Sequence, residues 1–211
     1  MWQNESERGA IVEELKIKPE IIVFAGPNGS GKSTFTELLR PVDIDYINAD
    51  EIKKYLKCSD MEAAKLAESQ REEHLSDMQQ FCFETVLSTD RNLKLLQKAK
   101  DKGYFIRCYY ILTVDPMINV QRVKSRVKSG GHYVPEEKII ARYDRALDLV
   151  KDVVEISDIC HIYDNSEEKP FRIFKKRKKE YFYDECPDWL KEDIELLTGI
   201  ECVQKKNLNE N

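Results

Sequence analysis

The sequence of 211 residues lacks any apolar run near the roughly 18 residues that a membrane-spanning helix needs, and its start has no apolar signal-peptide core. Its six cysteines form no C-x-x-C pair and share no ligand spacing with its three histidines, which argues against a zinc site. Cys82, Cys108 and Cys160 lie inside strand-like runs, where a reduced cysteine behaves as a small apolar side chain. We therefore expect a cytoplasmic protein with no membrane contact.

The sequence also has no internal repeat, no low-complexity linker and no visible boundary, so we expect one domain over residues 1–211. Its net charge of -5 argues against a general nucleic-acid-binding protein. We place the core at about 20–166, a lid at about 126–145 and a C-terminal extension at about 167–211.

Residues 26–33 (GPNGSGKS) fit the phosphate-binding loop pattern G-x-x-x-x-G-K-[ST] without a mismatch. The β-branched run 21–25 before the loop predicts a buried strand, and the spacing of apolar residues in 34–40 predicts a helix. The glycines let successive backbone N–H groups point at an anion, and the helix adds the positive end of its dipole. Lys32 would reach the β- and γ-phosphates, and the Ser33 hydroxyl would hold Mg²⁺. The expected ATP-binding residues are Gly26, Pro27, Asn28, Gly29, Ser30, Gly31, Lys32, Ser33 and Thr34.

The rest of the chain alternates between strand and helix patterns, which predicts an α/β fold with a parallel sheet of about five strands and helices on both faces. A charged helix over 60–78 is expected on the surface. Residues 171–183 predict a hairpin or an edge strand, where the lysines of 175–179 would discourage aggregation. Further strands are expected at 45–48, 81–85, 104–113 and 158–163, and further helices at 49–56, 92–102, 116–128, 135–150 and 187–197.

Polar residues that follow the strands are the candidate site, because ligands of such sheets bind beyond the carboxyl ends of the strands. Asp50 and Glu51 follow the second strand, and a phosphotransferase needs a carboxylate to orient and deprotonate a hydroxyl group. Capping of the next helix explains them equally well. Glu84 and Thr85 end the third strand, where a ligand-binding role is favoured over simple solvation.

Basic residues follow the fourth strand. Arg122 and Arg126 lie on one face of a helix and could neutralise charge on a moving phosphoryl group. Arg126 is the better candidate because it is closer to the Gly130–Gly131 turn, which resembles a lid hinge. His132 lies in that turn and Arg142 follows on the next helix. Asp115 is expected to cap its helix rather than bind a metal.

Several of these stretches together resemble the zeta-toxin family of P-loop kinases. They are residues 25–34, 47–52, 83–85, 130–135 and 163–166, in family order. The resemblance implies that Lys32 binds ATP, that Asp50 is the general base, that Glu84 and Thr85 contact the acceptor and that Arg126 compensates charge. It further implies transfer of phosphate to the sugar 3′-hydroxyl of UDP-N-acetylglucosamine, and a protein antitoxin as a candidate partner.

One position departs from the family pattern, because His132 replaces a second lid arginine. Either Arg142 or Arg122 substitutes for it, or the acceptor differs. Three functions remain open at this point, and the first of them is the one we favour. They are a kinase for a nucleotide sugar, a kinase for a nucleoside or an antibiotic, and an ATPase switch that phosphorylates nothing.

Overall fold

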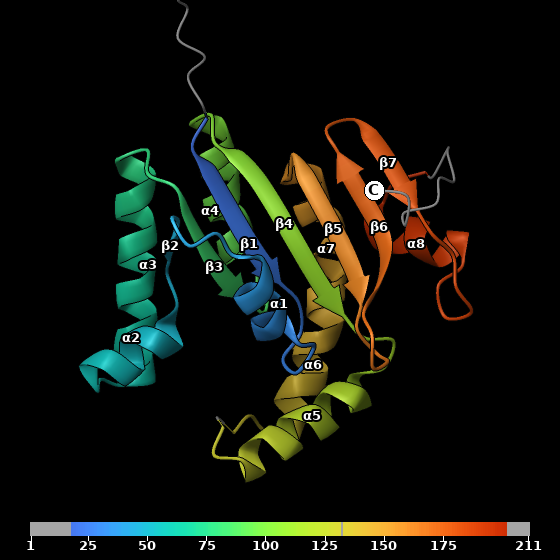
Figure 1. Cartoon of the computed structure of the whole chain (residues 1–211), viewed down its shortest axis with the longest axis horizontal. Coiled ribbons are helices and arrows are strands. Elements are labelled where there is room, and N and C mark those ends of the chain that lie inside the picture. Colours follow the sequence, from blue (N-terminus) through green and yellow to red (C-terminus); the bar gives the residue numbers. More distant parts are fainter. Residues whose placement is uncertain (1–17, 132, 202–211) are drawn as a thin grey trace, which may run out of the picture.

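The computed structural model describes residues 18–131 and 133–201, which share one seven-stranded sheet (Figure 1). The strand order is β2-β3-β1-β4-β5-β6-β7; the first five strands run parallel, and β6 and β7 form an antiparallel hairpin at one edge. The predicted α/β fold with a parallel sheet of about five strands and a C-terminal hairpin is thus confirmed. The strands are β1 (Glu20–Ala25), β2 (Asp45–Tyr46), β3 (Phe81–Thr85), β4 (Phe105–Leu112), β5 (Ile159–Asp164), β6 (Phe171–Arg177) and β7 (Glu180–Tyr183).

Helices cover both faces of the sheet: α1 lies on the face towards the viewer in Figure 1, and α4, α7 and α8 lie on the other. The helix predicted over 135–150 ends at Asp148, and a second helix follows directly. The last helix begins later than expected, because residues 186 and 189 pair with each other before it. The helices are α1 (Lys32–Leu39), α2 (Ala49–Leu56), α3 (Asp60–Ser76), α4 (Arg91–Asp101), α5 (Pro116–Lys128), α6 (Glu136–Asp148), α7 (Val150–Ile156) and α8 (Lys191–Thr198).

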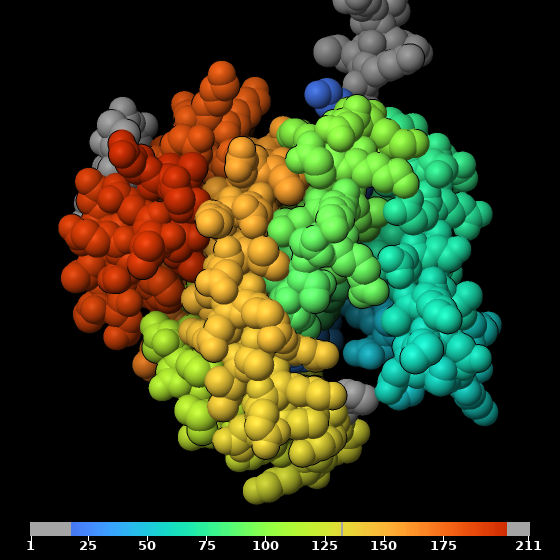
Figure 2. Space-filling model, turned by 180° about the vertical axis from the view of Figure 1, so that it is seen from behind, coloured from blue at the N-terminus to red at the C-terminus, as the bar shows by residue number. Residues whose placement is uncertain are grey.

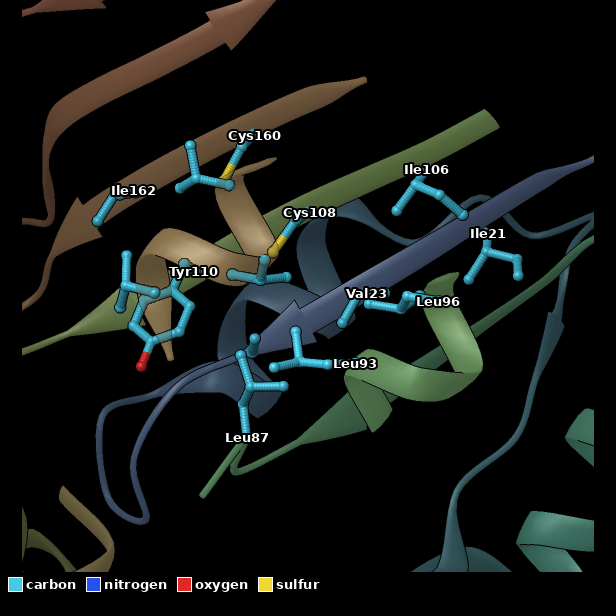
Figure 3. Packing of buried hydrophobic residues seen from close by; sticks show 14 of the residues in the cluster. Ile21, Val23, Leu87, Leu93, Leu96, Ile106, Cys108, Tyr110, Cys160 and Ile162 are labelled. Carbon is cyan, nitrogen blue, oxygen red and sulfur yellow. The ribbon is translucent and has the colours of Figure 1, made fainter. Parts of the chain in front are cut away.

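The main core lies between the sheet and the helices α4, α7 and α8. Figure 3 shows the part of this core that lies beside α4 and α7. Cys108 and Cys160 are neighbours on β4 and β5, and both are fully buried free thiols, as expected of small apolar side chains. The Tyr110 hydroxyl donates to the carbonyl of Ala146 at 2.7 Å, so its one polar atom is satisfied inside the core. Complete burial of the aliphatic side chains around them, such as Ile106 and Ile162, stabilises the fold by about 1.5–3 kcal/mol each.

The opposite face carries a row of stacked rings. Tyr109 lies between Phe24 and His161, with ring centroids 5.4 Å away on either side. His161 in turn stacks on Tyr163 at 6.3 Å. Burial first, and then nearby cations led by Arg172, lower the pKa of His161 to about 4. This imidazole is therefore neutral at pH 7.

The interpretation of residues 175–179 as an edge strand was wrong. Strand β6 pairs with β5 on one side and β7 on the other, so β7 is the edge. Lys176 is only 8% exposed, and its ammonium group donates to the carbonyl oxygens of Val154 at 2.7 Å and Glu155 at 2.9 Å. It thus satisfies orphan carbonyls near the C-terminus of α7, where a cation also complements the helix dipole.

The surface location expected for the helix over 60–78 was also incomplete. Helix α3 buries Ala63, Ala67, Arg71 and Leu75, one residue every fourth position. This stripe has only one large apolar side chain, Leu75, because alanine and arginine occupy its other three positions. The hydrophobic pattern of residues 60–78 therefore gave no indication of a buried face.

Across the described ranges, no helix combines the length and the apolar character needed to cross a bilayer.

Candidate functional site

The loop between β1 and α1 forms the centre of the site. Gly31, with φ of 99°, precedes α1, which begins at Lys32, so the first N–H groups of the helix face the loop. Gly26 has φ of 139°, and a Cβ atom there would lie 1.9 Å from the carbonyl oxygen of Ile111 on β4. Only glycine fits this position. Backbone N–H groups at a helix N-terminus, held this tightly, can bind a phosphate group.

Lys32 is buried beneath this loop, and its ammonium group donates to the carbonyl of Pro27 at 2.8 Å. Burial lowers its pKa to about 8; the nearby Glu84 carboxylate raises the pKa and the Arg126 guanidinium lowers it. A buried lysine with one hydrogen bond keeps donors available for an anion. A triphosphate is the anion that the loop sequence predicts.

The Glu84 carboxylate lies beside the Ser33 hydroxyl, which donates to it at 3.1 Å. The Tyr46 hydroxyl donates to the other carboxylate oxygen at 2.8 Å, and the Asn48 amide donates to Tyr46. Burial and the Glu84 charge raise the pKa of Tyr46, so the phenol stays protonated and keeps donating. A hydroxyl and a carboxylate this close fit Mg²⁺, which binds few protein oxygens and keeps phosphate and water ligands.

Asn48 is the residue that caps α2, because its side-chain oxygen accepts from the backbone N–H groups of Asp50 at 2.7 Å and Glu51 at 3.3 Å. The alternative that Asp50 or Glu51 caps this helix was therefore wrong. Both carboxylates are exposed, but Asp50 lines the larger cavity described below, whereas Glu51 is not among the described residues that line it. The cap fixes the first turn of α2, and of its two carboxylates Asp50 is the one that lines this cavity.

Thr85 ends β3 with its hydroxyl oxygen accepting from the backbone N–H of Leu87 at 3.0 Å and from the Asn92 amide at 2.7 Å. It is 8% exposed and lines the same cavity as Glu84. These two hydrogen bonds fix the loop between β3 and α4, which forms one wall of the cavity.

Two cavities meet at the phosphate-binding loop. The larger, of about 600 Å³, extends from the loop past Asp50, Glu84 and Thr85 to α3 and α4. Figure 2 shows the surface hollowed between α4, in green, and the cyan segment of α2 and α3. The smaller, of about 240 Å³, lies between α1 and α5. The described residues that line both cavities are Gly29, Lys32, Ser33 and Arg126.

The arginines expected at the site are placed differently from one another. Arg126 lies where the two cavities meet, and the Gly130–Gly131 turn packs against it: the Gly131 N–H donates to its carbonyl at 2.9 Å. Arg142 lines the larger cavity and approaches the Asn28 side-chain oxygen at 3.5 Å. Arg122 lines only the smaller cavity. The expectation for His132 falls outside the described residues.

The guanidinium of Arg122 donates to the carbonyl oxygens of Asn165 at 2.6 Å and Ser166 at 3.1 Å, which ties α5 to the loop after β5. The Asn165 amide donates to the carbonyl of Ser30 at 2.8 Å and so supports the phosphate-binding loop. Asn165 was not among the expected site residues, although its place after a parallel strand could have indicated it. Asp115 caps α5 as expected, because its carboxylate accepts from the N–H of Met117 at 2.7 Å.

Comparisons with known proteins agree with this architecture. A protein of Haemophilus influenzae (strain Rd), described only as uncharacterized, is 30% identical over 127 residues, which cover 58% of this chain and 91% of that protein. A crystal structure of the AvrRxo1-ORF1:AvrRxo1-ORF2 complex with ATP is similar with a TM-score of 0.67 at 15% identity, covering 88% of this chain and 64% of that one.

A structure of the PezAT chromosomal toxin–antitoxin system of Streptococcus pneumoniae is similar with a TM-score of 0.53 at 23% identity, covering 70% of this chain and 68% of that one. This chain therefore spans slightly less than two thirds of the AvrRxo1 chain. At these identities the solved structures show a shared fold. The sequence profile of the Zeta toxin family matches residues 6–179, which is most of the sequence, and the chain therefore belongs to the zeta toxin family.

Proposed function

We propose that this protein is an ATP-dependent kinase that transfers the γ-phosphate to a hydroxyl group of a small molecule. The observation that carries the proposal is the meeting of two cavities at the phosphate-binding loop, with Lys32 and Arg126 lining both. A triphosphate tail bound there would point from one cavity into the other. Phosphoryl transfer needs this arrangement, since donor and acceptor must approach the same phosphorus atom in line.

In this mechanism the nucleotide enters the smaller cavity and the acceptor enters the larger one. Lys32 and the loop N–H groups bind the phosphates, and Arg126 stabilises the charge that builds up on the transferring group. Asp50 accepts the proton of the acceptor hydroxyl. Mg²⁺, held by Ser33 and Glu84, would supply electrostatic neutralisation of the phosphate oxygens.

Glu84 and Thr85 line the acceptor cavity, and Arg142 adds a second cation beside Asn28. Arg142 is therefore our candidate for the position where His132 departs from the family pattern. The guanidinium of Arg122 is engaged with backbone carbonyls, so in our mechanism it acts on the site by holding α5 against the loop after β5.

A nucleotide sugar such as UDP-N-acetylglucosamine is the acceptor we propose, on the basis of membership in the zeta toxin family. The cavity of about 600 Å³ lies within the range of roughly 300–1,000 Å³ that small-molecule sites occupy. A protein antitoxin is a candidate partner, because one similar structure belongs to a toxin–antitoxin system.

The test is incubation of the purified protein with Mg-ATP and a metabolite extract, followed by mass spectrometry for species heavier by one phosphate. We expect the Asp50→Asn variant to lower transfer by about 100- to 10,000-fold while ATP binding stays nearly unchanged, because it removes only the proton acceptor. Glu51→Gln is the matched control, since Glu51 is the neighbouring carboxylate outside the cavity. Equal turnover of both variants would remove Asp50 from the mechanism.

The competing function is an ATPase switch that phosphorylates nothing. ADP release that depends on an added acceptor would support the kinase. Release at the same rate without any acceptor would support the switch.

A further inference from the structure

The larger cavity carries an excess of positive charge among the described residues that line it. Its five cationic side chains are Lys32, Arg71, Arg91, Arg126 and Arg142, and its two carboxylates are Asp50 and Glu84. Two of the cations, Lys32 and Arg126, also line the smaller cavity and are accounted for by the triphosphate. Arg71 and Arg91 lie instead on α3 and α4, the helices that form the opposite end of the larger cavity. The phosphates of ATP do not account for these two arginines, and whereas Arg91 pairs with Glu68 at 3.6 Å, no carboxylate among the described residues forms an ion pair with Arg71.

Arg71 is 8% exposed, although a buried arginine normally has its hydrogen bonds satisfied. Its Nε has no hydrogen-bond partner among the described residues. The guanidinium lies over the Phe83 ring at 5.2 Å, and burial lowers its pKa, with the nearby Arg91 charge lowering it further. A cation in this state favours any ligand that supplies negative charge and acceptor atoms.

The two carboxylates whose charges act on Arg71, Glu68 and Glu72, are paired with other cations. Glu68 pairs with Arg91 at 3.6 Å, and Glu72 pairs with Lys98. The α3 residues one and two turns before Arg71 are Ala67 and Ala64, and both line the cavity. Two alanines keep this wall of the cavity open, whereas longer side chains at these positions would extend into it.

We propose that Arg71, with Arg91 beside it, binds an anionic group of the acceptor, at the end of the acceptor molecule away from the hydroxyl that is phosphorylated. A phosphate, a diphosphate or a carboxylate would each satisfy the guanidinium with charge-assisted hydrogen bonds. This inference rests on the proposed kinase function. It makes Arg71 a specificity residue that selects anionic acceptors and discriminates against neutral nucleosides and cationic antibiotics.

The test measures binding of paired probes to the protein with ADP and Mg²⁺ already bound, so that the phosphate-binding loop is occupied. The pairs are UDP-N-acetylglucosamine with N-acetylglucosamine, uridine 5′-monophosphate with uridine, and pantothenate with its alcohol analogue pantothenol. We expect the anionic member of at least one pair to bind at least tenfold more tightly. The pair that shows this difference tells whether a phosphate or a carboxylate is the recognised group.

Arg71→Met should weaken binding of that anionic member by 10- to 100-fold, leave its neutral counterpart unchanged and leave ADP affinity unchanged. Arg71→Lys should lose less affinity for the anionic member than Arg71→Met, because it keeps the positive charge. It should still bind more weakly than the unmodified protein, because it lacks the planar guanidinium. Arg40→Met is the matched control, since Arg40 also lies over a ring, that of Tyr46 at 4.6 Å, but lines neither cavity among the described residues. Melting temperatures of all three variants would show whether α3 stays packed.

Two outcomes would overturn the inference. One is equal binding of charged and neutral members in every pair, and the other is an Arg71→Met effect no larger than that of Arg40→Met. Both leave the kinase proposal intact if ADP still binds and some acceptor is phosphorylated. Failure of ADP or ATP to bind at all would instead refute the proposed function.

Discussion

Binding of ATP should weaken as the pH rises through the pKa of Lys32, and the structure sets the size of the effect. The pKa of this buried lysine is about 8 in the free protein. A triphosphate beside it would raise the pKa back towards the ordinary lysine value of 10.5, because an adjacent anion favours the ammonium form. Binding therefore takes up a proton at pH values between the two pKa values.

The protonated fraction of Lys32 in the free protein falls from about 76% at pH 7.5 to about 9% at pH 9.0, for a pKa of about 8. The affinity for ATP should fall by the ratio of these fractions, about eightfold or roughly 1.2 kcal/mol. Titration calorimetry in two buffers of different ionisation enthalpy measures both the affinity and the proton uptake, which should approach one proton per site at pH 9.0.

Lys32→Arg is the control, because its guanidinium stays charged over this range and its ATP affinity should not change with pH. Glu84→Gln should move the pH midpoint downward, because the Glu84 carboxylate raises the pKa of Lys32. An affinity of the unmodified protein that is flat from pH 7.5 to 9.0, with no proton uptake, would refute the reasoning about Lys32.

Two further predictions concern the lid turn and the ring stack. Gly131→Ala would place a Cβ atom 2.5 Å from Arg126 Cγ and 2.9 Å from the Arg126 carbonyl oxygen. Because this clash would displace Arg126, we expect kcat to fall by about 10- to 100-fold with little change in ATP affinity. An unchanged kcat would show that Arg126 is not positioned by this turn. His161 has its pKa lowered to about 4 in the folded state, so the unfolded state binds more protons and stability is lost as pH falls from about 6.5 towards 4. We expect the free energy of unfolding, measured with urea, to fall between pH 7.0 and 4.5 by about 2 kcal/mol more in the unmodified protein than in His161→Phe. An equal fall in both proteins would contradict this prediction.

The phosphate-binding loop could be predicted from the sequence because its determinants are local. Residues 26–33 need particular backbone angles and a lysine at one position, and the flanking apolar runs specify a strand and a helix by their own periodicity. Alternation of these patterns was sufficient to predict the parallel sheet, which the strand order confirms.

The sequence alone could not show which of two neighbouring polar side chains lines the cavity. Asp50 and Glu51 are adjacent and chemically similar, yet the cap from Asn48 sets the first turn of α2 so that Asp50 lines the cavity. The lysines of residues 175–179 looked like an exposed edge until the position of β7 made β6 an inner strand. Asn48 lies only two positions before Asp50, but which side of α2 meets the cavity depends on how the helix packs, and the inner position of β6 depends on β7.

What the sequence by itself determined is the anion-binding loop and the class of fold, since both follow from the conformations and periodicity of short segments. What only the tertiary structure decided is which side chains surround that loop. Arg71 and Asn165 are 39 and 133 positions from Lys32 in the chain, yet packing of α3 and of the loop after β5 brings them to the cavity and to the phosphate-binding loop. Such long-range contacts leave no periodic trace in the sequence, because the strand order and helix packing that create them involve the whole chain.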